Sequence, residues 1–468
     1  MVSMGVSAAP GYLVEQAQHL IARQERYARI WPDFWPVGQS FLLYGSNGAC
    51  VLYSPQQTPE GFEPAGESSS GLWQGTCEGT RFAGPMWLLA RVGGVPTHAV
   101  RVDRSSKDVE SLVVHEAFHA HQRCAFQPEP WGIPTFDFAL DVDWVRSKLR
   151  ETLLLFEAVA QQDEPARWHL ARMVLALRQQ RLEAMPRSAG ETEDHYMRSE
   201  GTATFVAYRA NDFGAGAELA KRMAEGAMRT DLPSLSWEWL LRWQSYETGA
   251  AAAVLLDLAE WPEWRQRVAR GESLYRLLAE ASAFNPAETR PLTEQAMLQP
   301  LPSVERVVGA LVKQRDVLEK VRKRYRSAAR HRLQIRPSGA GMGSLQASRM
   351  GSIDGRTVVF DPNPFVSEDD EMAIRISGRP ILLGKAPDDS GASLIEVALA
   401  RAPKIEGCNL ADSEGLCPAG SRIVAGRAQL ALKQPARVRQ TPEVTLVWSL
   451  SAGTDPSERP AECPSVNP

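Results

Sequence analysis

The chain has 468 residues, more than one hydrophobic core normally serves, so we expect two or three domains. Hydrophobic residues make up 44% and charged residues 23% of the sequence, as is typical of soluble globular proteins. The 52 lysines and arginines stand against 56 aspartates and glutamates, which argues against a protein that coats nucleic acid. No apolar stretch approaches the roughly 18 residues that a membrane-spanning helix needs, so we expect no membrane span.

The start of the chain and its cysteines bear on the cellular compartment. Residues 1–5 contain no basic segment and no apolar run follows them, so no secretory signal is visible and we expect a cytoplasmic protein. Six cysteines are too few for a disulfide scaffold, and the absence of Cys-x-x-Cys excludes a cysteine-type zinc site. Cys408 and Cys417 flank a polar loop and would be able to pair in an oxidising compartment, which leaves export open. Free thiols are an equal alternative.

Residues 1–104 predict a small mixed α/β region. A helical pattern covers residues 12–30. Short apolar runs separated by glycine, proline and serine turns then predict strands. The predicted strands are residues 41–44, 50–53, 86–89 and 98–102.

Residues 105–330 predict an almost continuously helical domain. Apolar residues recur there at spacings of three and four, and proline, glycine or acidic turns separate the segments. The predicted helices are residues 142–162, 166–185, 191–210, 237–260 and 304–325.

The strongest functional signal is a His-Glu-x-x-His sequence formed by His115, Glu116 and His119. Two histidines four residues apart lie on one face of a helix, one turn apart, so both imidazoles can bind one zinc ion. The glutamate can take a proton from a water molecule at that metal. We expect Ser105 and Asp108 to cap this helix. The alternative is a pair of half-buried histidines on an amphipathic helix.

A catalytic zinc needs a third protein ligand and one open position. After His121, which we interpret as structural or as a neighbour of the ligands, the next histidine is His169, so a carboxylate is the other option. Glu200 is followed by Gly201 and Ala203, small residues that fit a helix packed closely against another, with Glu200 reaching the metal. The alternative is an exposed glutamate beside a packing glycine.

Two more polar segments belong to the helical region. Tyr246 precedes a run of small residues that starts at Gly249, and its phenol is suited to donate a hydrogen bond to an oxyanion at the zinc. The alternative for Tyr246 is a packing residue on an amphipathic helix. We interpret the cluster of Glu191, Glu193, Asp194 and His195 as the acidic first turn of a helix, with orientation of the zinc ligands as the alternative.

Together and in this order, these segments resemble the gluzincin metallopeptidases, most closely the aminopeptidase N family. The resemblance rests on His-Glu-x-x-His at residues 115–119, Glu-Gly-x-Ala at 200–203 and Tyr-x-x-Gly at 246–249. It implies that His115, His119 and Glu200 bind one Zn²⁺ per chain, that Glu116 is the general base and that Tyr246 is the oxyanion donor. It also implies a zincin-like catalytic domain and a peptide or protein substrate. Residues 142–185, between the second histidine and the glutamate, predict an inserted helical hairpin.

Residues 331–468 predict an all-β domain with the pattern of a sandwich. Short runs rich in β-branched residues occur there between turns. These runs are residues 357–360, 374–376, 381–383, 423–432 and 444–450.

The sequence thus predicts a multidomain α+β protein with an N-terminal α/β region, a zincin-like helical catalytic domain and a C-terminal all-β domain. The predicted function is zinc-dependent hydrolysis of peptide bonds, with Glu116 as general base. One alternative is a non-catalytic zincin-like module for binding or assembly. The other is a zinc hydrolase that acts on a non-peptide amide or ester.

Overall fold

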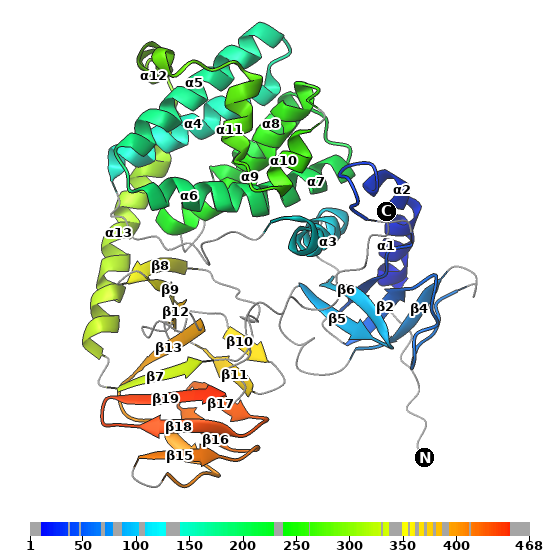
Figure 1. Ribbon diagram of the computed structural model, residues 1–468, viewed down its shortest axis with the longest axis vertical. Coiled ribbons are helices and arrows are strands. Elements are labelled where there is room, and N and C mark those ends of the chain that lie inside the picture. Colours follow the sequence, from blue (N-terminus) through cyan, green and yellow to red (C-terminus); the bar gives the residue numbers. More distant parts are fainter. Residues whose placement is uncertain are drawn as a thin grey trace.

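The computed structural model combines helices with mixed and antiparallel sheets, as expected of a multidomain α+β protein (Figure 1). It describes residues 11–35, 38–45, 48–66, 71–77, 87–102, 108–127, 141–228, 237–261, 263–328, 331–336, 349–353, 356–360, 365–368, 372–377, 381–385, 393–410 and 413–449. None of the helices in these ranges combines the length and the apolar character that crossing a bilayer requires.

In the described part of the N-terminal region, two helices accompany a mixed sheet. The elements are α1 (Gly11–Ala22), α2 (Gln24–Tyr27), β1 (Phe41–Tyr44), β2 (Ala49–Tyr53), β3 (Glu63–Pro64), β4 (Leu72–Thr76), β5 (Trp87–Val92) and β6 (Val95–Arg101). The described strands follow the order β3-β4-β2-β1-β6-β5, in which β1 and β6 run parallel and the other neighbours antiparallel. The four predicted strands correspond to β1, β2, β5 and β6, whereas β3 and β4 were not predicted.

Alternating side chains of this sheet enter two different cores. Phe41 and Leu43 of β1 belong to the large core that also contains the buried face of α1. Leu42 and Tyr44 point to the opposite face, where they pack with Cys50. The large core continues through the helical region as far as Ala296, so the sheet and the helices share one apolar interior.

The helical region lies above the sheet in Figure 1, with α3 between the two. Its helices are α3 (Val109–Ala125), α4 (Val142–Ala160), α5 (Glu164–Glu183), α6 (Arg187–Tyr196), η3 (Met197–Gly201), α7 (Thr202–Ala210), α8 (Ala217–Ala227), α9 (Trp237–Leu258), α10 (Trp264–Ala269), α11 (Leu274–Ala281), η4 (Pro286–Glu288), α12 (Thr289–Met297) and α13 (Pro302–Ala328). The predicted hairpin at residues 142–185 is formed by α4 and α5, which pack against each other. The predicted helix at 191–210 is divided into α6, the π-helical turn η3 and α7.

The described strands of the C-terminal region form two sheets around one core. Its strands are β7 (His331–Arg336), β8 (Arg349–Ile353), β9 (Arg356–Phe360), β10 (Phe365–Glu368), β11 (Met372–Ile376), β12 (Ile381–Lys385), β13 (Ser393–Leu399), β14 (Lys404–Glu406), β15 (Glu414–Cys417), β16 (Arg422–Ala425), β17 (Ala428–Leu432), β18 (Ala436–Gln440) and β19 (Val444–Ser449). One sheet has the order β10-β11-β17-β16-β14 and the other β15-β18-β19-β7-β13-β12-β9-β8. Ile374 and Leu430 from the first sheet share a core with Ile335 and Ile395 from the second, as in a sandwich.

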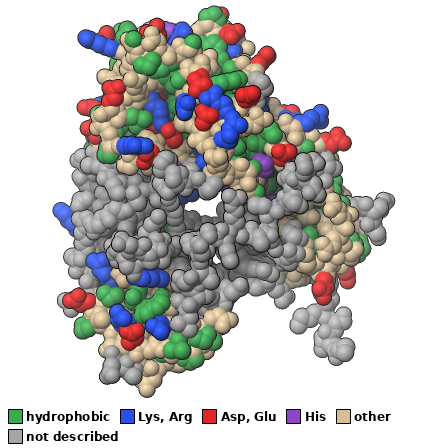
Figure 2. Space-filling view, in the orientation of Figure 1, with side chains coloured by type: hydrophobic (Ala, Val, Ile, Leu, Met, Phe, Trp, Pro, Cys, Tyr) green, Lys and Arg blue, Asp and Glu red, His purple; other side chains and the backbone are tan. Residues whose placement is uncertain are grey.

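The helical region and the C-terminal sheets are joined by α13, which runs along the side of the molecule (Figure 1). Val304 and Val307 of α13 pack with Trp144 of α4, and β8 contacts α9. On the face shown in Figure 2, acidic and basic side chains of the helical region are interspersed.

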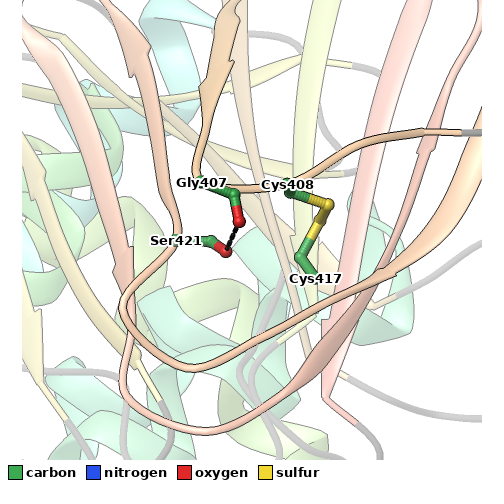
Figure 3. The surroundings of a disulfide bond; sticks show 4 residues. All are labelled: Gly407, Cys408, Cys417 and Ser421. Carbon is green, nitrogen blue, oxygen red and sulfur yellow. Dashed lines mark hydrogen bonds between the residues drawn. A yellow bond between two sulfur atoms is a disulfide. The ribbon is translucent and has the colours of Figure 1, made fainter.

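The structure contains disulfides, whereas the sequence leaves free thiols as an equal alternative for Cys408 and Cys417. Cys408 and Cys417 are bonded, and the buried Ser421 hydroxyl donates a 3.0 Å hydrogen bond to the Gly407 carbonyl next to this bond (Figure 3). Cys50 of β2 is bonded to Cys77, which directly follows β4. Cys124 is disulfide-bonded as well, so none of the cysteines in the described ranges is a free thiol.

Candidate metal centre

Three side chains from two helical segments meet at one point. His115 and His119 come from α3, and Glu200 comes from η3. The Nε2 atoms of the two histidines are 3.1 Å apart, and the Glu200 Oε2 atom lies 3.0 Å from His119 Nε2 and 3.5 Å from His115 Nε2. The structure therefore brings together the three residues that the sequence suggested as metal ligands.

Helix α3 presents both histidines because its opposite face is anchored in the core. Val113, Val114 and Phe118 are buried there, at spacings that follow the helical period. Asp108 caps the helix by accepting a hydrogen bond from the Ser111 amide, so the helix begins at Val109. The cap predicted at Ser105 lies outside the described residues.

Near its start, α3 is also tied to the N-terminal helices by a buried carboxylate. Glu110 accepts a 2.6 Å hydrogen bond from the Tyr27 hydroxyl and pairs with Arg23 at 2.7 Å. Burial and the hydrogen bond to Glu110 raise the pKa of Tyr27, so this phenol keeps its proton. The histidines thus stand on a helix that is held on its buried side and at its first turn.

Glu200 is placed by a π-helical turn and by two glycines in contact. A π-helical turn contains an extra residue relative to an α-helix and often occurs at a functional site. A Cβ atom on Gly201 would lie 2.5 Å from the Gly249 Cα, and a Cβ on Gly249 would lie 2.6 Å from the Met197 carbonyl oxygen. Only glycine permits this approach of η3 to α9. The close helix contact inferred from Gly201 is therefore present, and its partner is the glycine of the Tyr-x-x-Gly segment.

The separations of the three donor atoms fit a zinc ion. Tetrahedral zinc with bonds of about 2.0–2.1 Å to nitrogen and oxygen implies donor–donor separations of about 3.3–3.4 Å. The observed separations of 3.0, 3.1 and 3.5 Å bracket this value. The side chains of His115, His119 and Glu200 are 14%, 20% and 14% exposed, so the cluster is sheltered but can be reached from outside. Two imidazoles and one carboxylate match the ligand types that zinc takes.

The electrostatics of the cluster favour a bound cation. Burial would raise the pKa of Glu200, but hydrogen bonds from His115 and His119 hold it well below its ordinary value. Burial lowers the pKa of His119, but the Glu200 carboxylate outweighs burial and raises it to about 9. The carboxylate is therefore ionised, and the point where the donors meet attracts either a proton or a metal ion.

Tyr246 stands beside the cluster in a group of stacked rings. Its ring is parallel to that of His115, with centroids 5.8 Å apart, and the Trp243 ring also stacks on it, with centroids 5.1 Å apart. Burial and the Glu200 carboxylate raise the pKa of Tyr246, so the phenol stays protonated and can donate a hydrogen bond. Glu116 is half-buried on α3, and its charge acts on both His119 and Tyr246. The five residues for which the sequence predicted a role at the metal thus lie in one neighbourhood.

Two polar residues of this neighbourhood were not recognised in the sequence. Arg242, one turn before Tyr246, places its guanidinium 3.6 Å from Glu200 Oε1, the oxygen that does not face the histidines. Gln122 accepts a 2.7 Å hydrogen bond from the His119 ring. Arg242 lies at the i−4 position of Tyr246 and Gln122 at the i+3 position of His119, and these spacings were the only available signals.

The acidic residues before Glu200 do not form the first turn of a helix. Helix α6 begins at Arg187, so Glu193 and Asp194 lie in its second half. Glu193 is buried and pairs with Lys148, Arg178 and Arg181, while Asp194 pairs with Arg178. The capping prediction is therefore wrong: these carboxylates fix α6 to α4 and α5.

His121 has a structural position, as the sequence suggested. Its ring packs against the rings of Phe34 and Phe118. Burial lowers the pKa of His121 to about 4, so the ring is neutral near pH 7. His121 is not part of the cluster of possible metal donors, which consists of His115, His119 and Glu200.

Comparison of this chain with models of protein families, with curated proteins and with solved structures found no match.

Proposed function

We propose that the chain is a zinc-dependent metallopeptidase of gluzincin type that hydrolyses peptide bonds. The observation that carries this proposal is the convergence of His115, His119 and Glu200, with Glu116 and Tyr246 beside them. Zinc bound there would activate a water molecule and polarise the scissile carbonyl. The domain that holds the site would then be zincin-like.

The chain's own residues would divide the remaining chemistry. Glu116 would take the proton from the attacking water and pass it to the leaving amine. Tyr246 would donate a hydrogen bond to the substrate carbonyl oxygen as negative charge develops on it, and the raised pKa of this phenol keeps that proton available. Arg242 would fix the outer oxygen of Glu200, which leaves the other oxygen directed at the histidines.

An extended peptide would bind along β5. Among the described strands, β5 is one of the two edge strands of the N-terminal sheet, and its neighbour β6 is the strand that precedes α3. The free edge of a strand offers backbone donors and acceptors that a peptide can pair with. Because β5 pairs with β6 and β6 contacts α3, this edge would lie one strand away from the strand that touches the helix of the histidines.

Zinc content tests the proposal directly. We expect about one zinc per chain in the wild-type protein. Loss of a hydrogen-bond partner of a metal ligand typically lowers metal affinity roughly 10- to 100-fold, so loss of the ligand itself in Glu200→Ala should lower zinc affinity by more than this. Mass spectrometry of the purified proteins measures the metal. Glu157→Ala is the matched control, since Glu157 is an exposed glutamate of α4 and its loss should leave zinc content unchanged.

Other outcomes of the zinc measurement would overturn or change the proposal. A wild-type protein that takes up no zinc, even after reconstitution, would overturn the proposal and favour a binding or assembly module. Zinc that survives in Glu200→Ala would show that the third ligand is another residue. If zinc is bound and a peptide library is not cleaved while small amides or esters are, the substrate class would be the non-peptide alternative.

We also propose that the protein works in an oxidising compartment. We expected a cytoplasmic protein, but stable disulfides are rare in the cytoplasm, and Cys50–Cys77 and Cys408–Cys417 are both bonded. The disulfides therefore favour the second option, export.

Thiol mapping checks this compartment. In protein purified without reductant and alkylated under denaturing conditions, we expect these four cysteines to stay unlabelled and to appear as two linked peptide pairs. Reduction should then lower the melting temperature, because each native disulfide typically contributes about 2–4 kcal/mol to stability. Complete alkylation without prior reduction would contradict the proposed compartment.

A further inference from the structure

Gln122 connects the helix of the two histidines with the turn that carries the glutamate. Its side chain is 8% exposed and uses both ends of its amide. The Oε1 atom lies 2.7 Å from His119 Nδ1. The Nε2 atom donates to the Ser199 carbonyl at 2.7 Å and to the Thr202 hydroxyl at 2.8 Å. A third, longer contact of 3.3 Å reaches the Arg198 carbonyl.

These partners fix the orientation of the amide. Backbone carbonyls only accept hydrogen bonds, so the end of Gln122 that faces Ser199 and Arg198 must be the NH₂ group. The other end is then the amide oxygen, which also only accepts. The hydrogen between Gln122 and His119 therefore resides on His119 Nδ1, and the Nε2 atom of this ring is the one that faces Glu200.

The Gln122 amide also donates hydrogen bonds to the π-helical turn. The wider turn displaces backbone carbonyls from the regular pattern of helical hydrogen bonds. The two hydrogens of the Gln122 amide are directed at the Ser199 carbonyl and the Thr202 hydroxyl, with the Arg198 carbonyl as a longer contact. The Thr202 hydroxyl itself donates to the Arg198 carbonyl at 2.6 Å, so the same group of hydrogen bonds reaches both carbonyls. Glu200 lies within this short segment, between Ser199 and Thr202.

We infer that Gln122 is a positioning residue that sets both halves of the donor cluster: it keeps the proton of His119 on Nδ1 and holds η3 so that Glu200 faces the two histidines. The inference rests on the proposed zinc site. A partner that orients a metal-binding histidine typically changes metal affinity 10- to 100-fold when it is removed. Here one side chain would act on a histidine and on the segment that carries the carboxylate, two ligands far apart in the sequence.

Gln122→Met tests the inference, because methionine has a similar shape but neither donates nor accepts strongly. We expect about 10- to 100-fold weaker zinc binding in a chelator competition. In protein labelled with ¹⁵N-histidine, the Nδ1–H resonance of His119 should be lost through exchange with water. In metal-free protein, amide hydrogen exchange in residues 197–204 should become faster.

Gln122→Glu separates the two roles. Its carboxylate can still accept from His119 Nδ1, but it has no hydrogens for the carbonyls of η3. We expect this variant to keep the Nδ1–H resonance and to show the same fast exchange in residues 197–204.

Gln244→Met is the matched control. Gln244 is also a buried helical glutamine, but its amide donates to the Ala227 carbonyl on α8. Zinc affinity and the His119 resonance should therefore not change.

The outcomes distinguish this inference from the proposed function. If the wild-type protein binds no zinc, the proposed function fails, while the resonance and the exchange in metal-free protein still test the link between α3 and η3. If the wild-type protein binds zinc and Gln122→Met shows unchanged affinity, resonance and exchange, the positioning role of Gln122 is overturned. If Gln122→Met does not fold, the loss of the resonance in Gln122→Glu overturns it instead.

Discussion

Glu116→Gln is expected to lower peptide turnover by about 10²- to 10⁴-fold, the typical contribution of general acid–base catalysis, while zinc stays at about one per chain. The amide has the shape of the carboxylate but cannot take a proton from water. Glu116 lies on α3 next to His115 and is not among the three converging donors, so the metal should remain bound. Cleavage of a fluorogenic peptide library and metal analysis of the same samples measure both quantities.

Two variants make this expectation specific. Glu157→Gln, the same change on an exposed part of α4, should leave turnover unchanged. Tyr246→Phe should retain zinc and lose roughly 10²-fold in turnover, as when one donor to a developing oxyanion is removed. Peptidase activity that persists in pure Glu116→Gln protein at the wild-type level would remove Glu116 from the mechanism.

Gly249→Ala is expected to destabilise the protein and to weaken zinc binding together. The added methyl would stand 2.6 Å from the Met197 carbonyl oxygen and 2.7 Å from the Gly201 Cα. Both are backbone atoms, so no side-chain rotation can relieve the clash, and α9 must move away from η3. Overpacking of this kind costs about 1–3 kcal/mol or more. Since η3 carries Glu200, we expect the same shift to separate the carboxylate from the histidines.

Thermal unfolding and chelator competition on the same protein test this coupling. Gly309→Ala is the matched control, because Gly309 is a helical glycine of α13 and a Cβ atom added to it would meet nothing within 4 Å. That substitution should stabilise the helix by up to about 1 kcal/mol and leave zinc affinity unchanged. A Gly249→Ala protein with wild-type melting temperature and zinc affinity would show that the contact between α9 and η3 is looser than the structure indicates.

The sequence was most informative where the determinants are local. The face shared by His115 and His119 follows from the helical period alone, and the small residues Gly201 and Ala203 indicated a close helix contact before its partner was known. The β-rich runs after residue 331 likewise follow from local alternation and turns, and they correspond to strands such as β11 and β12.

Features that depend on distant partners were not predicted. An exposed cap was the natural interpretation of Glu193 because charged residues usually face water, whereas its partners Lys148 and Arg181 lie on other helices and satisfy it inside the core. The role of Gln122 depends on carbonyls 76 and 77 residues away. The pairing of Cys50 with Cys77 arises from strands that are neighbours only in the folded sheet.

The extra residue of the π-helical turn changes the directions in which side chains point along the segment from α6 to α7. Each residue advances an α-helix by about 100°, so an inserted residue rotates everything after it by that angle relative to everything before it. Glu193 before the turn faces the buried ion pairs, and Glu200 within it faces the histidines. Deleting one residue between them would restore a regular helix, but only one of these two carboxylates would then keep its direction.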